Sequence, residues 1–156
     1  MNKKHLDISG EELAGLMRVV LEKKADFRFK AKGHSMSPFI KNLDIVTISP
    51  LFTNKGPYAG DVVAASFFER KSIMVHRIIA EKQGKFIIKG DNNQSTDGVF
   101  EQDQIIGLVS CVERNDRKIW FGQGFFGKII AIFSKSGLLN RIILPVLRKL
   151  RRFFPF

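Results

Sequence analysis

The feature that most constrains the fold is a change of hydrophobic period at Asp26. From Phe27 to Lys32 the sequence FRFKAK alternates apolar and cationic residues, which is typical of a half-buried β-strand. No stretch of about 30 residues alternates strand with helix, so a doubly wound fold is disfavoured. We therefore predict a mainly β core over residues 26–121. Its further strands are expected at Ile45–Ile48, Asp61–Phe68, Ser72–Ile79, Phe86–Lys89, Ile105–Val112 and Lys118–Phe121, with polar turns between them at 50–60 and 90–98.

Before this core, residues 1–25 are predicted to hold one amphipathic helix. Ser9 and Glu12 have the spacing of a capping box, with Ser9 as the N-cap. Apolar residues then recur at helical spacing from Leu13 to Leu21, so the helix is expected to reach about Lys24. Charged residues interrupt this first apolar stretch, which does not fit a secretory signal peptide.

The chain has 156 residues, enough for one domain with a hydrophobic core. Cys111 is the only cysteine, so an internal disulfide and a cysteine-based zinc site are both excluded, and the redox compartment stays undecided. The net charge is +11, and it is unevenly distributed. Nine of the 26 basic residues, and none of the 15 acidic ones, lie in residues 117–156. Such a segment favours an anionic membrane surface or a nucleic acid as its partner.

Residues 122–156 combine these cations with apolar residues. Leu138, Leu139, Ile142, Ile143, Val146, Leu147 and Leu150 form a stripe at helical spacing. We predict a basic amphipathic tail that lies on an anionic membrane surface, with a first piece at Phe125–Phe133. Pro145 is expected to kink the helix or to divide it into two shorter pieces. The alternative is a helix packed on the core, which an excess of cations argues against. The tail lacks the interleaved polar and aromatic residues suited to bases, so nucleic acid is disfavoured. No run of about 18 uncharged apolar residues predicts a transmembrane helix.

Three polar spots along the predicted sheet have residues suited to catalysis. A serine hydroxyl such as that of Ser35 needs a base within hydrogen-bond reach. His76 is a candidate base, because the ordinary pKa of histidine lies near neutrality. The polar stretch from Gly90 to Asp97 offers an aspartate to orient the imidazole. Spacing alone does not distinguish this set from a core histidine and an ordinary turn.

Four segments around these polar residues resemble motifs of a known superfamily. Gly33-His-Ser-Met-Ser-Pro38 resembles the nucleophile box of the signal peptidase I superfamily, which also includes the self-cleaving LexA/UmuD proteases. Gly60-Asp-Val-Val63, Val75-His-Arg-Ile-Ile79 and Lys89-Gly-Asp-Asn-Asn93 follow in the order and approximate spacing of that superfamily. The resemblance covers about residues 27–109. It implies a signal-peptidase/LexA-like β catalytic core, with the helices outside it.

The resemblance also implies roles for single residues. Ser35 matches the acylating serine. His76 stands where bacterial signal peptidases and LexA relatives have lysine, and where the archaeal and endoplasmic-reticulum branch has histidine. In that branch an aspartate completes the site. We favour Asp97 as the partner of His76 and Asp91 as the residue that orders the loop, although the two roles can be exchanged.

Neighbours of Ser35 take supporting roles by the same resemblance. Met36 is expected to pack beneath the substrate cleft and Pro38 to fix the turn. Gly33 stands where many bacterial relatives have a serine that assists the oxyanion hole. Its lack of a side chain leaves that hole to backbone N–H groups. No metal or other cofactor is expected.

Two functions are consistent with these residues. The first is a serine endopeptidase that removes leader segments from peptides or membrane-associated proteins. The alternative is a LexA/UmuD-like regulator that cuts itself at Ala14–Gly15, although this bond lies within the predicted helix. We expect a peripheral membrane protein, on the cytoplasmic face by default, whereas members of the superfamily act on the opposite face. The natural substrate and the oligomeric state are not determined by the sequence.

Overall fold

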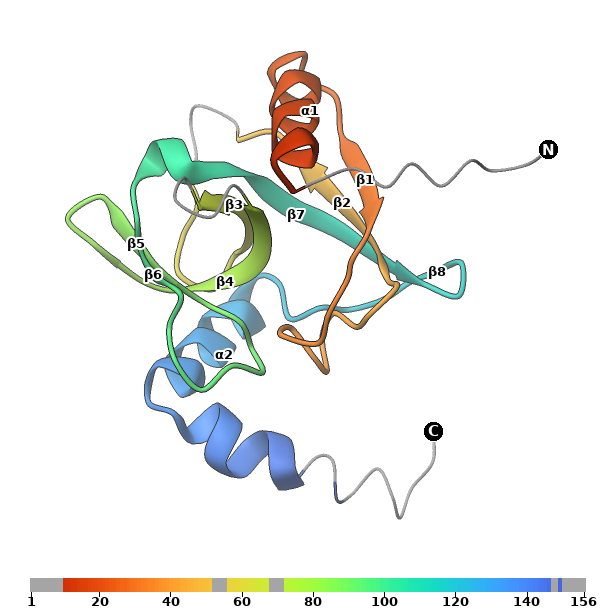
Figure 1. The fold of residues 1–156 in the computed structure, drawn as a ribbon. Helices are drawn as coiled ribbons and strands as arrows, with labels where there is room; N and C mark the ends of the chain where they lie inside the picture. Colours follow the sequence, from red (N-terminus) through yellow and green to blue (C-terminus); the bar gives the residue numbers. More distant parts are fainter. Residues whose placement is uncertain (1–9, 52–55, 68–71, 147–148, 150–156) are drawn as a thin grey trace.

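The computed structural model describes residues 10–51, 56–67, 72–146 and 149. Within these residues, one curved antiparallel sheet has the strand order β1-β2-β7-β3-β4-β5-β6, and β8 pairs with β7 (Figure 1). The strands are β1 (Phe27–Lys30), β2 (Ile45–Ser49), β3 (Val62–Phe67), β4 (Ser72–Lys82), β5 (Lys85–Lys89), β6 (Gly98–Phe100), β7 (Ile105–Arg114) and β8 (Arg117–Lys118). The mainly β prediction is confirmed, and the sheet fits a LexA-like core.

Two helices lie at opposite ends of the sheet in Figure 1. Helix α1 (Gly10–Glu22) packs on β4 and β7, and α2 (Phe125–Lys135) packs on β4. Met17 and Leu21 of α1 are buried in one hydrophobic cluster with Val46 and Val112 of the sheet. The predicted N-cap, Ser9, lies outside the described residues. The helix ends at Glu22 rather than Lys24, and Lys24 has a left-handed backbone with φ of 59°.

Strand β4 is the long strand that organises the site. Its first half pairs with β3, where Val63 lies opposite His76, and its pairing with β5 begins one residue later, where Arg77 lies opposite Lys89. Strand β4 therefore pairs with β5 only from Arg77 onward, and His76 is the last residue before that pairing begins. The other free edge nearby belongs to β1, for which the described part of the chain shows pairing with β2 alone.

Two parts of the predicted sheet are corrected by the structure. Gly98, predicted to end a polar turn, instead begins β6, because Phe86 and Phe100 lie opposite each other and are both buried. The predicted strand Lys118–Phe121 is reduced to β8. The reason is that side chains take up the backbone groups of Phe121: its N–H donates to Gln123 Oε1 at 3.2 Å and its carbonyl accepts from Arg77 at 3.0 Å.

A buried carboxylate fixes the start of β2. Asp44 is 2% exposed and accepts two hydrogen bonds from Arg114, at 2.8 and 2.7 Å. The N–H of Lys41 donates to the same carboxylate at 2.7 Å. Burial raises the pKa of Asp44, but the hydrogen bonds from Arg114 and Lys41 outweigh it and hold the pKa below the ordinary 3.8. The carboxylate therefore stays ionised and ties this turn to β7.

The described part of the tail consists of two helical pieces, and the bend between them lies at another residue than predicted. Helix α2 and a π-helical turn, η2 (Leu139–Ile143), do not lie free of the sheet, since Ile130, Ala131 and Leu139 are buried. The chain bends at Gly137, whose φ is +77°, and the helix continues past Pro145 to Val146. The predicted residues Leu147 and Leu150 lie outside the described part.

Within the described residues, no single helix is long and apolar enough to cross a membrane. One pair of helices, Phe125–Lys135 and Leu139–Val146, meets the length and composition only when taken together, and the two meet at 91°.

Candidate active site

Three polar side chains from distant parts of the chain form one hydrogen-bonded row. Ser35 lies in the turn between β1 and β2, His76 in the middle of β4, and Asp97 directly before β6. His76 Nε2 is 2.7 Å from Ser35 Oγ, and His76 Nδ1 is 2.7 Å from Asp97 Oδ2. Both contacts are short enough for direct hydrogen bonds. The structure thus brings together the three residues that the sequence analysis placed in one set.

The chemistry of the partners fixes the direction of each bond. An ionised aspartate only accepts hydrogen bonds, so His76 Nδ1–H donates to Asp97. The lone pair of Nε2 then faces Ser35 and can accept the hydroxyl proton. His76 is only 8% exposed, and the Asp97 side chain is 17% exposed. Competition from bulk water for these bonds is therefore reduced.

The turn that carries Ser35 is held by the loop that precedes Asp97. The N–H of Asn92 donates to the Ser35 carbonyl at 2.6 Å, and its side-chain amide donates to the His34 carbonyl at 3.1 Å. A Cβ on Gly90 would lie 2.8 Å from the same Ser35 oxygen. Glycine at this position therefore permits the close approach of the two loops.

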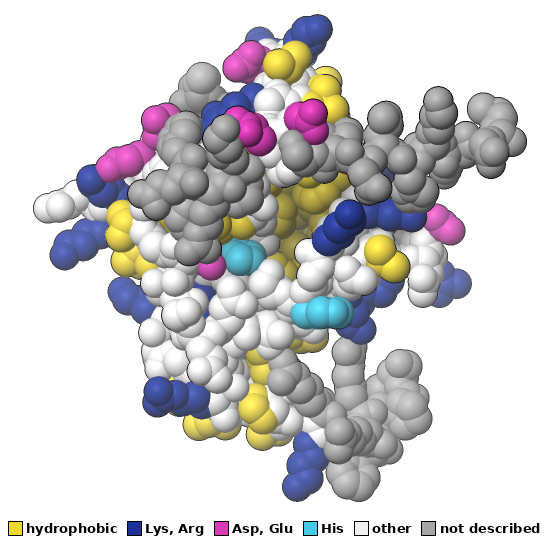
Figure 2. Space-filling view, viewed as in Figure 1, with side chains coloured by type: hydrophobic (Ala, Val, Ile, Leu, Met, Phe, Trp, Pro, Cys, Tyr) yellow, Lys and Arg dark blue, Asp and Glu magenta, His cyan; other side chains and the backbone are white. Residues whose placement is uncertain are grey.

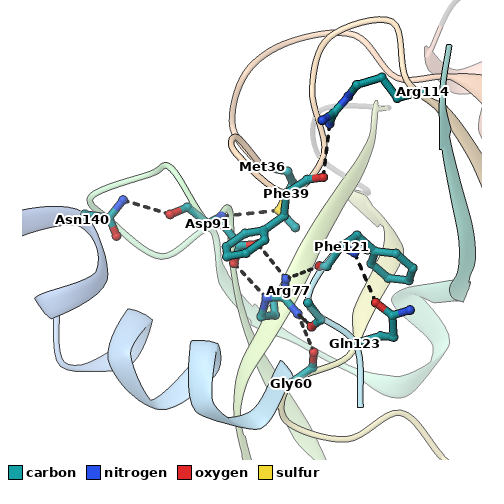
Figure 3. Close-up of polar contacts among 10 residues, drawn as sticks. Met36, Phe39, Gly60, Arg77, Asp91, Arg114, Phe121, Gln123 and Asn140 are labelled. Carbon is teal, nitrogen blue, oxygen red and sulfur yellow. Dashed lines mark hydrogen bonds and ion pairs between the residues drawn. The ribbon is translucent and has the colours of Figure 1, made fainter. Parts of the chain in front are cut away.

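Asp91 does not share the position of Asp97. Its two carboxylate oxygens each accept a 2.8 Å hydrogen bond from Arg77, and both side chains are fully buried (Figure 3). Arg77 also donates to the carbonyls of Gly60, Gly122 and Phe121, at 2.8, 2.6 and 3.0 Å. The sequence left open which of the two aspartates is the partner of His76. In the structure Asp97 contacts His76, and Asp91 contacts Arg77.

The three supporting residues lie in or next to the same turn. Gly33 has φ of +100°, and its N–H donates to Asn42 Oδ1 at 3.0 Å, so this amide already has a partner. Met36 is 4% exposed, and its sulfur accepts a 3.4 Å hydrogen bond from the N–H of Asp91. Pro38 follows a cis peptide bond within the turn. These contacts link the turn to Asn42, which lies ahead of β2, and to the loop of Asp91.

A cleft of about 610 Å³ opens beside Ser35 and His76. Figure 2 shows a hollow with hydrophobic side chains on its floor. Its apolar lining comes chiefly from β1 and β4 and includes Phe27, Phe29, Met36, Ile40, Ile73 and Val75. Leu13 of α1 also lines it, and among the described lining residues there is no aspartate or glutamate. The cleft can therefore accept an extended apolar segment next to the serine hydroxyl.

Sequence reasoning missed two polar residues behind the site. Lys89 is 3% exposed, and its Nζ donates to the Ser134 carbonyl at 3.0 Å and to Asn140 Oδ1 at 3.2 Å. Burial lowers the pKa of Lys89, and the charges of Asp91 and Asp97 partly offset this effect. The only signals were a lysine ending an apolar strand and an asparagine within an apolar helix.

A serine, an imidazole and a carboxylate in this geometry define the class of serine hydrolases. Among the described residues, no group of three or more His, Cys, Asp or Glu side chains is placed to hold a metal ion. Residues 4–110, well over half of the chain, match the Peptidase S24-like family, and the chain belongs to that family. This match supports the wider superfamily to which the sequence motifs point. A comparison with curated proteins gave no significant match.

Proposed function

We propose that the protein is a serine endopeptidase of the signal-peptidase type, which cleaves peptide segments in trans. The observation that carries this proposal is the row Ser35–His76–Asp97, with two 2.7 Å contacts beside an open cleft that has apolar and cationic lining residues. His76 stands where lysine is found in LexA relatives, so the resemblance favours the Ser-His branch. The family membership by itself covers both serine peptidases and self-cleaving proteins.

The geometry supports acyl transfer in two steps. Ser35 Oγ attacks the scissile carbonyl while His76 Nε2 takes the hydroxyl proton, and Asp97 stabilises the resulting imidazolium. His76 then gives this proton to the leaving amine as the C–N bond breaks. Water, activated by the same imidazole, hydrolyses the ester on Ser35 and regenerates the enzyme. Every proton that moves passes through His76.

The free strand edges beside the cleft suggest how a substrate binds. An extended peptide placed between β1 and the first half of β4 can pair with exposed backbone groups. Alternate side chains of such a peptide point into the apolar cleft. The superfamily resemblance implies small residues such as alanine before the scissile bond.

Self-processing at Ala14–Gly15 is the second candidate, because the family includes self-cleaving proteins. This bond lies inside α1, between the buried Met17 and the start of the helix. A scissile peptide has to be extended to reach a serine in a cleft. Cleavage there requires α1 to unwind and Met17 to leave the core. Helix α1 instead contributes Gly10 and Leu13 to the lining of the cleft, which favours the trans-acting peptidase.

Intact-mass spectrometry separates the two functions. The purified chain, incubated alone, is expected to keep its full mass, while a mixture of extended peptides with apolar and small residues is cut. The peptide cuts are expected to disappear in Ser35→Ala. Loss of a fragment ending at Ala14 in the wild type, but not in Ser35→Ala, would instead identify a self-processing protein.

We further propose that the C-terminal helices dock on an anionic membrane surface. Helix α2 packs its Ile130–Ala131–Ser134 face on the core and turns a second apolar face outward. Exposed apolar residues in this region are Trp120, Phe125, Phe126, Ile132, Phe133, Leu138, Ile142 and Val146. Lys128, Lys135 and Arg141 lie on the same helices, and no acidic residue occurs in 117–156. An apolar face on helices whose charged residues are all cations matches anionic lipid. The cytoplasmic face stays a prediction from the sequence.

Flotation with lipid vesicles tests this docking. The full chain is expected to float with vesicles containing anionic lipid and to remain behind with neutral vesicles. Phe125→Ser/Phe126→Ser is expected to lower the bound fraction severalfold, because both rings are more than half exposed. Leu16→Ser/Val19→Ser on α1, where the side chains are also exposed, is the matched control and is expected to bind as the wild type does. Equal loss in both variants would argue against a membrane-facing role for α2.

A further inference from the structure

The segment that follows the family match supports the active site from behind. The match ends at residue 110, whereas the partners of the buried Arg77, Lys89 and Asp91 include residues 121–140. Figure 3 shows Asn140 reaching from the C-terminal helix toward the loop of Asp91. The helix of Asn140 therefore contacts the loop that holds the turn of Ser35, although this helix lies outside residues 4–110, which match the family.

The orientation of the Asn140 amide follows from its neighbours. Lys89 only donates hydrogen bonds, so the atom 3.2 Å from its Nζ is the amide oxygen of Asn140. The amide nitrogen then points the other way and donates to the Asp91 carbonyl at 3.0 Å. Lys89 is itself anchored on the Ser134 carbonyl at the end of α2. The buried ammonium thus fixes the direction in which Asn140 donates.

Asn92, the residue after Asp91, contacts Ser35 directly. Asn140 holds the carbonyl of Asp91, and the N–H of Asn92, on the following residue, donates to the Ser35 carbonyl at 2.6 Å. We propose that Asn140 is a positioning residue, which sets the 90–93 loop and thereby the place of Ser35 relative to His76. This role rests on the proposed peptidase function of the same site.

The substitution Asn140→Asp tests this role, because it alters one of the two contacts. The new carboxylate can still accept the hydrogen bond from Lys89. Its second oxygen replaces the amide nitrogen, so the hydrogen bond to the Asp91 carbonyl is lost. The melting temperature is expected to stay close to that of the wild type, since the new anion beside Lys89 and the lost contact with the Asp91 carbonyl act in opposite directions. The maximal rate at which a fluorophosphonate probe labels Ser35 is expected to fall about 10-fold to 100-fold. The probe concentration for half-maximal rate is expected to stay within about twofold.

Hydrogen exchange gives a readout that does not depend on catalysis. Amides of residues 86–97, and that of Asn92 above all, are expected to exchange faster in Asn140→Asp than in the wild type. Asn115→Asp, in the exposed turn between β7 and β8, is the matched control and is expected to change neither exchange nor labelling. If Asn140→Asp fails to fold, Asn140→Leu, which leaves Lys89 its bond to Ser134, takes its place.

The outcomes separate this inference from the proposed function. Wild-type labelling and exchange in a folded Asn140 variant would overturn the positioning role and leave the peptidase intact. A wild type that the probe does not label at Ser35 would count against the peptidase, and the exchange of Asn92 would still decide whether Asn140 holds the loop. Slower labelling with a matching drop in melting temperature, and no local change in exchange, would assign Asn140 to general stability only.

Discussion

Replacing Ser35 by alanine is expected to abolish both peptide cleavage and labelling by a serine-reactive probe. The hydroxyl is the only group on this residue that can form the acyl-enzyme, so activity should fall by ~10⁴-fold or more. Unfolding should change little, because Ser35 is only partly buried and its backbone contact with Asn92 is unaffected. Labelling followed by mass spectrometry of the modified peptide measures the first effect, and thermal unfolding measures the second.

Two neighbours in the same turn provide matched controls. Ser37→Ala removes the other hydroxyl between Gly33 and Pro38, and is expected to retain labelling. His76→Ala should reduce turnover by orders of magnitude, whereas His34→Ala, at an exposed position, should have little effect. Equal labelling of Ser35→Ala and the wild type would remove Ser35 as the nucleophile. Full activity in His76→Ala would show that another group is the base.

Replacing Arg77 by methionine is expected to give the largest loss of stability of any single substitution considered for this chain. Arg77 and Asp91 are both fully buried, and removing the cation leaves the Asp91 carboxylate without its partner. It also leaves the carbonyls of Gly60, Gly122 and Phe121 without this donor. Breaking a buried pair of this kind costs about 3–5 kcal/mol of unfolding free energy. Urea denaturation measures this loss directly.

Arg28→Met is the matched control for this prediction. Arg28 forms an ion pair with Glu113 at the same 2.8 Å, but its side chain is 55% exposed. Water and salt screen an exposed pair, so the expected loss is about 0–1 kcal/mol. Similar losses in the two variants would show that burial does not set the strength of the Arg77–Asp91 pair. Arg77→Lys is not expected to rescue stability, because lysine lacks the planar fork that contacts both carboxylate oxygens.

The sheet was predictable because strand formation leaves a pattern along the chain. Alternation at 27–32 and the short apolar runs predicted most of the strands to within a few residues. The errors came where contacts that form only on folding decide how far a strand extends. Phe121 is kept out of β8 by Gln123 and Arg77, and β6 forms because Phe100 meets Phe86. No local pattern records such partners.

The candidate site was predictable where a motif carries it. The box around Ser35, the strand of His76 and the Gly90–Asp97 loop could all be found from the sequence. The distances between Ser35, His76 and the aspartate could not be found from the sequence. Nor could the sequence show whether Asp91 or Asp97 contacts His76. That choice depends on which aspartate meets Arg77, a residue whose role as the centre of five hydrogen bonds becomes visible only after folding. Lys89 begins one of the superfamily segments, but nothing in the sequence indicated its contacts with Ser134 and Asn140, and Asn140 lies in no recognisable motif.

Three features could be read from the amino-acid sequence alone: the mainly β class, the residues available for acyl transfer and the concentration of positive charge in residues 117–156. These features depend on local residue patterns and on composition, both of which can be read from the sequence without knowing any contact between distant residues. Three others became visible only in the folded chain: Asp97 contacts His76, Asp91 contacts Arg77, and the C-terminal helices pack one face on the core while another stays exposed. These outcomes depend on contacts between residues at least 14 positions apart, which form when the hydrophobic core packs and its buried polar groups find partners.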